Sequence, residues 1–143
     1  MGNGMLTNED IDAYLSPLTE EQSASIRAIR ALIIERTPYL VEEIDSGKWF
    51  GGLLTYHTED RVFVFALGPL SAGNTTFHMM AFYASTTLQE KYGAELKKLL
   101  SGKSCIKFKQ ASQLPEEAIR GIIDATPKYI DVAQEMFAKR KKK

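Results

Sequence analysis

Three side chains of this chain are suited to metal binding or nucleophilic chemistry: His57, His78 and Cys105. His78 stands in an apolar stretch, where a histidine could bind a metal or a ligand, act as a base, or pack with a hydrogen-bond partner. Cys105 has no partner cysteine, so its thiol is either a nucleophile close to His78 or a small buried hydrophobe. His57 lies beside Glu59 and Asp60, a group that could coordinate a divalent ion at a hairpin tip or could face solvent.

A second group of candidates is acidic. Glu42, Glu43 and Asp45 follow Glu35 at a spacing that predicts one acidic ridge on helical turns. Hard cations favour carboxylate oxygens, so this ridge is the physical basis for a metal site that could take iron. The alternative is a solvated helix face.

Aromatic residues are concentrated in the middle of the chain. Alternation in a strand places His78, Met80 and Phe82 on one face. If helices leave one sheet face partly uncovered, this face is an apolar pocket or partner surface, with Trp49, His78 and Phe82 as candidate ligand contacts. Otherwise these residues form the core. The aromatic set is Trp49, Phe50, Tyr56, Phe63, Phe65, Phe77, Phe82 and Tyr83.

The elements that must position these residues follow from apolar periodicity and from capping residues. Thr7 or Asn8 is expected to cap the first helix, and Thr19 to Gln22 and Thr86 to Gln89 are capping-box patterns for later ones. Leu40, Val41 and Ile44 predict one more helical turn. Strands are predicted over residues 49–57, 62–67, 77–83 and 104–109, and further helices after Pro115 and Thr126. This order predicts an α+β fold, with a mostly antiparallel sheet of about four or five strands packed with helices.

Composition restricts the class of protein. The chain has 143 residues, 44% hydrophobic and 25% charged, which is typical of one globular domain, here residues 1–138. Residues 139–143 are all basic and are expected to form a disordered tail. Because that tail lacks interleaved aromatic residues, a nucleic-acid partner is not expected. No apolar run approaches the roughly 18 residues of a membrane span. With no signal peptide and a single cysteine, we expect a cytoplasmic protein with no membrane partner.

A set of residues spread along the chain resembles the YdhG-like family of small bacterial domains. The matching positions are Ile11, Tyr14, Leu15, the helix Ile26–Ile33, Pro38, Glu43-Ile44, His78, Phe82-Tyr83, Gly102-Lys103, Ile106, Phe108, Leu114-Pro115 and Ile119. Many members have no known function, and some are called frataxin-like intracellular iron chaperones. The resemblance implies a frataxin-like sandwich of helices and sheet, and it implies iron handling.

Three hypotheses on function follow from these observations. The first is a small intracellular binding protein without catalytic activity, a carrier or chaperone for iron or a small ligand. The second is a protein-interaction domain, homodimeric or with another partner, that uses an aromatic sheet face. The third is an enzyme using His78, which ranks last because no second polar group is placed beside it and no phosphate loop or nucleophile elbow is present.

Overall fold

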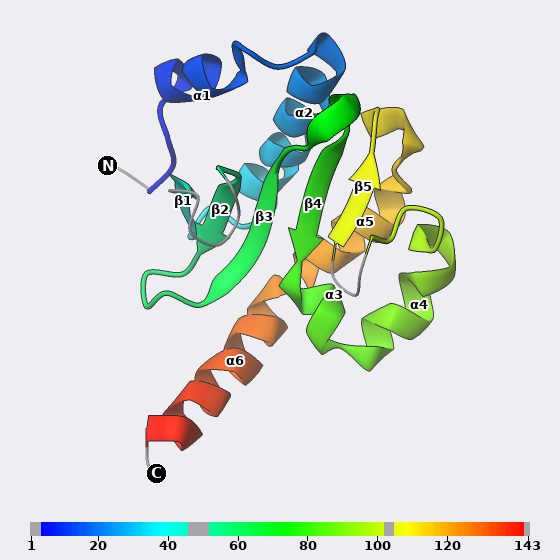
Figure 1. Cartoon of the computed structure of the whole chain (residues 1–143). Coiled ribbons are helices and arrows are strands. Elements are labelled where there is room, and N and C mark those ends of the chain that lie inside the picture. Colours follow the sequence, from blue (N-terminus) through cyan, green and yellow to red (C-terminus); the bar gives the residue numbers. More distant parts are fainter. Residues whose placement is uncertain (1–3, 46–51, 102–104, 142–143) are drawn as a thin grey trace.

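The computed structural model describes residues 4–45, 52–101 and 105–141, which fold into an antiparallel sheet flanked by helices (Figure 1). This confirms the predicted α+β class. The sheet has five strands in the order β1-β2-β3-β4-β5, so each strand pairs with its neighbour in the chain. The elements are α1 (Asn8–Leu15), α2 (Glu20–Arg36), β1 (Val41–Ile44), β2 (Leu54–His57), β3 (Phe63–Pro69), β4 (Thr75–Met79), α3 (Met80–Ala84), α4 (Thr86–Leu96), β5 (Cys105–Phe108), α5 (Glu116–Asp124) and α6 (Thr126–Lys141).

Local capping chemistry sets the first two helix starts. The Thr7 hydroxyl accepts a hydrogen bond from the Asp10 amide, and the Asp10 side chain accepts one from the Thr7 amide. Thr19 and Gln22 form the same reciprocal pair at the start of α2. Each pair satisfies amides that have no partner within the helix. These two predicted starts are confirmed.

One face of the sheet carries the large apolar side chains and is covered by helices. Cross-strand register places Leu67, Phe77 and Ile106 in one row of this face. Helices α2 and α5 lie against it in Figure 1, and their isoleucines belong to the same buried cluster. Tyr56, Phe65 and Phe77 are fully buried there. These three aromatic side chains are therefore core residues, which is one of the two alternatives that the sequence leaves open for them.

The opposite face of the sheet holds a row of small and polar residues. The register aligns Glu43, Thr55, Ala66, His78 and Cys105 in one row across the five strands. Thr55 and Ala66 in the middle of the row are buried. This face therefore holds His78 and Cys105 side by side, on strands that are far apart in the sequence.

Two predicted elements are wrong. Residues 41–44 form strand β1 and not a helical turn, because they pair with β2 on one edge, while on the other edge the Glu42 amide donates to the Gly4 carbonyl at 2.8 Å. The third predicted strand ends at Met79, and α3 begins at Met80. This turn brings Ala81 and Phe82 into the core, so Phe82 does not share a strand face with His78.

The C-terminal helix α6 extends from the lower end of the sheet in Figure 1 and is helical through Lys141. The sequence predicts a disordered tail from Lys139. That prediction is wrong for residues 139–141, which belong to the end of α6. Within the part of the chain that the structure describes, no helix combines the length and the apolar character needed to cross a membrane.

Candidate functional site

His78 and Cys105 are direct cross-strand partners, which the sequence analysis considered as a catalytic pair. The Cys105 thiol donates to the Ser101 carbonyl at 2.8 Å. Burial raises the pKa of the Cys105 thiol and lowers the pKa of His78. Both shifts favour the neutral forms of the two groups. A reactive cysteine needs the thiolate, so this arrangement is poorly suited to nucleophilic catalysis.

The other two predicted ligand contacts are placed differently. Phe82 is 2% exposed and packs in the core. Trp49 lies outside the described residues. The structure therefore does not bring His78 and Phe82 together in one apolar pocket on the sheet.

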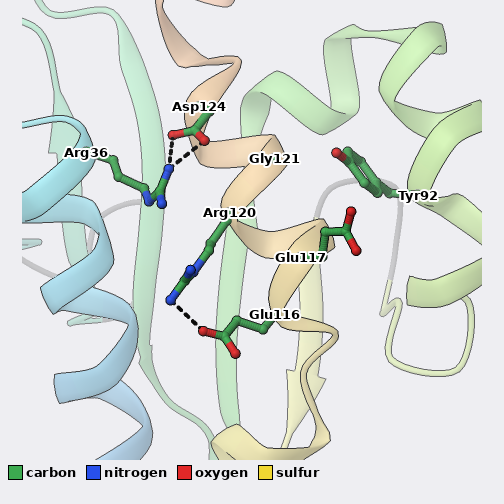
Figure 2. Close-up of a pocket in the computed structure, with 7 residues that line it drawn as sticks. All are labelled: Arg36, Tyr92, Glu116, Glu117, Arg120, Gly121 and Asp124. Atoms are coloured by element: carbon green, nitrogen blue, oxygen red, sulfur yellow. Dashed lines mark hydrogen bonds and ion pairs between the residues drawn. The ribbon is translucent and has the colours of Figure 1, made fainter.

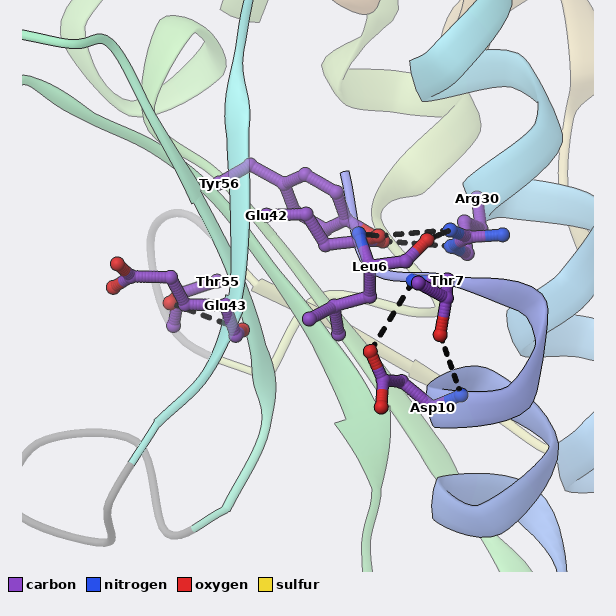
Figure 3. A network of polar contacts seen from close by, with 8 residues as sticks. All are labelled: Leu6, Thr7, Asp10, Arg30, Glu42, Glu43, Thr55 and Tyr56. Atoms are coloured by element: carbon purple, nitrogen blue, oxygen red, sulfur yellow. Dashed lines mark hydrogen bonds and ion pairs between the residues drawn. The ribbon is translucent and has the colours of Figure 1, made fainter. Parts of the chain in front are cut away.

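Glu42, the first predicted metal ligand, is fully buried and already bound by protein groups (Figure 3). Arg30 donates to both carboxylate oxygens, from Nε at 2.7 Å and from Nη2 at 2.8 Å. The Tyr56 hydroxyl and the Leu6 amide also donate to this carboxylate. Burial and the neighbouring Glu42 charge raise the pKa of Tyr56 well above its usual value, so the phenol remains a donor. This network connects the N-terminal segment, α2 and the sheet.

Glu43 belongs to the opposite side of β1. Its carboxylate lies 3.2 Å from His57 Nε2 and 3.4 Å from Arg61 Nη1. Asp45 follows the end of the strand, where its amide donates to the Leu53 carbonyl. The three acidic residues therefore do not form the predicted helical ridge, because alternation in a strand separates Glu42 from Glu43. Among the described residues, no three His, Cys, Asp or Glu side chains are grouped to hold a metal ion.

A charged groove of about 440 Å³ lies between α2, α4 and α5 (Figure 2). Its ion pairs are internal: Arg36 Nη1 contacts both oxygens of Asp124 at 2.6 and 2.7 Å, and Arg120 contacts Glu116 at 2.6 Å. Gly121 lets Tyr92 approach α5, since a Cβ there would lie 2.1 Å from the phenol oxygen. These contacts hold three helices together and leave the arginines engaged.

A second hollow, of about 330 Å³, has a more apolar lining and lies where α3, α4 and α6 meet. We call it the α3–α4–α6 pocket. Helix α6 contributes Lys128, Tyr129 and Val132, and Ala125 just before it completes the spacing of one helix face. The first turn of α4 and two alanines of α3 form the other wall. The lining residues are Ala81, Ala84, Ser85, Thr86, Thr87, Leu88, Ala125, Lys128, Tyr129 and Val132.

Hydrogen bonds hold the walls of the α3–α4–α6 pocket in place. Gln89 Nε2 donates to the carbonyls of Phe82 and Tyr83, each at 3.0 Å, which fixes the corner between α3 and α4. The Ser85 hydroxyl accepts from the Leu88 amide at 3.2 Å and caps α4. The Tyr129 hydroxyl donates to the Phe63 carbonyl at 3.1 Å, which anchors α6 to β3. These hydrogen bonds connect each wall to its neighbouring element.

The polar groups of this lining come from two threonines, one serine, one tyrosine and one lysine. Among the described residues that line it there is no carboxylate, imidazole or thiol. Burial raises the pKa of Tyr129, so its phenol remains neutral. The sequence does not indicate this pocket, because the pattern of residues 77–83 predicts a strand where the chain forms α3 from Met80. The spacing of Ala125, Lys128, Tyr129 and Val132 is the signal that could have indicated one wall.

Comparison with protein-family models, curated proteins and solved structures finds no match to this chain.

Proposed function

We propose that this protein is a small binding domain without catalytic activity, and that it holds a small ligand in the α3–α4–α6 pocket. The observation that carries the proposal is a hollow of about 330 Å³ with apolar walls and a few polar groups. Ligand sites in proteins commonly have this size and lining. The lack of an acid–base pair among the lining residues supports a carrier or sensor. The single cysteine supports a cytoplasmic location.

A second candidate function is protein interaction, and exposed apolar side chains at the edge of the pocket support it. Val132 lines the pocket and is 46% exposed, and Tyr83 of α3 is 48% exposed. Exposed apolar side chains beside a hollow are a common feature of partner surfaces. The partner here would be a protein that inserts an apolar side chain into the pocket, including a second copy of this chain.

The iron-carrier version of the first hypothesis has the YdhG-like resemblance as its support. In the described residues, the Glu42 carboxylate is bound by Arg30, Tyr56 and the Leu6 amide. Iron would have to displace these donors from a buried site. We therefore favour an organic ligand in the α3–α4–α6 pocket.

The proposal is tested by screening a library of small apolar and amphipathic molecules by ligand-observed NMR, followed by ¹H–¹⁵N shift mapping. Binders should shift amides of residues 81–88 and 125–132. Ala84→Trp fills the pocket from α3 and should abolish binding. Ala28→Trp is the matched control, because Ala28 is also an exposed helical alanine but lies outside the pocket. Shifts elsewhere, or unchanged binding by Ala84→Trp, would show that the pocket is not the site.

A further inference from the structure

Lys128 is the single charged residue among the ten that line the α3–α4–α6 pocket. None of the ion pairs among the described residues includes Lys128. The arginines of the neighbouring groove, in contrast, are paired with Asp124 and Glu116. The ammonium group of Lys128 is therefore available to a negatively charged ligand in the pocket.

Thr86 and Thr87, on the opposite wall of the pocket, add hydrogen-bond donors that also favour a negatively charged ligand. They are the first two residues of α4, where backbone amides have no acceptor within the helix. The Ser85 hydroxyl accepts a hydrogen bond from the Leu88 amide, and it does not cap the amides of Thr86 and Thr87. The positive end of the α4 dipole therefore faces the same hollow as Lys128.

Most of the remaining lining is apolar, so the uncharged part of the ligand is expected to be apolar as well. Ala81, Ala84, Leu88, Ala125 and Val132 offer hydrocarbon, and the Tyr129 ring is anchored through its hydroxyl to Phe63. A single cation in such a lining can neutralise one negative charge. A nucleotide or another polyphosphate would leave charges without partners against apolar walls, which is costly.

We infer that the ligand of the α3–α4–α6 pocket is a small monoanion with an apolar body, such as an aromatic or branched-chain carboxylate. Its carboxylate binds Lys128, and its body packs between α3, α4 and α6. This inference rests on the proposed function and narrows it to one chemical class. Ligand selection then depends on one ion pair at the rim and on the volume of the apolar floor.

The test uses a matched pair of probes, naphthalene-2-carboxylate and the neutral naphthalene-2-carboxamide, titrated by NMR and calorimetry. The parent protein should bind the acid about two- to fivefold more tightly than the amide, as expected of an exposed ion pair. Lys128→Gln should lose this preference while still binding the amide. Lys98→Gln is the control, because Lys98 is an exposed lysine of the region after α4 and lies outside the pocket. Added salt should weaken binding of the acid and not of the amide.

The outcomes separate this inference from the proposed function. Equal affinities for acid and amide, or a preference that survives Lys128→Gln, would overturn the monoanion inference and leave a neutral-ligand pocket. If the parent binds neither probe, the inference is overturned for this class of ligand. If the library screen is also blank, the proposed function is overturned as well. The ¹H–¹⁵N spectrum of each variant shows whether its fold is retained.

Discussion

Glu42 joins the N-terminal segment, α2 and the sheet through its carboxylate. It is fully buried and accepts hydrogen bonds from Arg30, Tyr56 and the Leu6 amide. Arg30 also donates to the Leu6 carbonyl at 3.1 Å. A buried carboxylate is tolerated only when its charge and lone pairs are satisfied in this way. An acidic side chain that looks like a metal ligand in the sequence is therefore a structural one.

Replacing Glu42 with alanine should lower the free energy of unfolding by about 3 kcal/mol, because the largely buried Arg30 charge loses its partner. The matched control is Glu43→Ala, since Glu43 is the next residue of β1 but has a half-exposed side chain. That change should cost only about 0.5 kcal/mol. Urea denaturation of both variants measures the difference. Equal losses would contradict the assignment of the buried network to Glu42.

His78 makes stability depend on pH on the acidic side. Burial lowers its pKa in the folded protein, so the unfolded chain, with a pKa near 6.5, binds a proton more readily. The stabilising contribution is therefore complete above about pH 6.5 and is lost as the pH falls below it. Melting temperatures measured from pH 7.5 to pH 5 test this contribution. Over that range the melting temperature of His78→Gln should fall less than that of the parent protein. Parallel profiles for the two proteins would rule out this contribution.

At the scale of elements, tertiary contacts stabilise the short segments, which are β1, α3 and the start of α4. Strand β1 is held by β2 on one edge and by the Gly4 carbonyl on the other. Helix α3 has only five residues and is held to α4 through Gln89. Helices this short have little stability of their own, so tertiary contacts decide whether they form.

The cap of α4 gives a direct test at this scale. The sequence pattern assigns the cap to Thr86, but the structure assigns it to Ser85, whose hydroxyl accepts from the Leu88 amide. Ser85→Ala should therefore reduce the free energy of unfolding by about 1 kcal/mol. Thr86→Ala should leave it nearly unchanged, since alanine is a good helix former. Chemical denaturation distinguishes the two positions, and a larger loss for Thr86→Ala would return the cap to that residue.

At the scale of the whole molecule, one hydrophobic cluster extends from Ile11 in α1 to Ile130 in α6. It includes buried residues from all six α-helices of the described residues and from strands β2 to β5. The α3–α4–α6 pocket lies at the edge of that core, where residues 81–88 meet residues 125–132. The proposed ligand therefore contacts segments that are about 40 residues apart in the chain.

The sequence by itself determined the fold class and the starts of α1 and α2. Capping by Thr7 and Thr19 acts over three residues, and apolar periodicity acts within one helix, so both can be read locally. Only the tertiary structure decided that 41–44 is a strand and that Glu42 is neutralised by Arg30, twelve residues away. It also decided that the hollow lies between α3, α4 and α6. These features depend on contacts between distant segments, and those contacts outweigh the weak local preferences of short stretches.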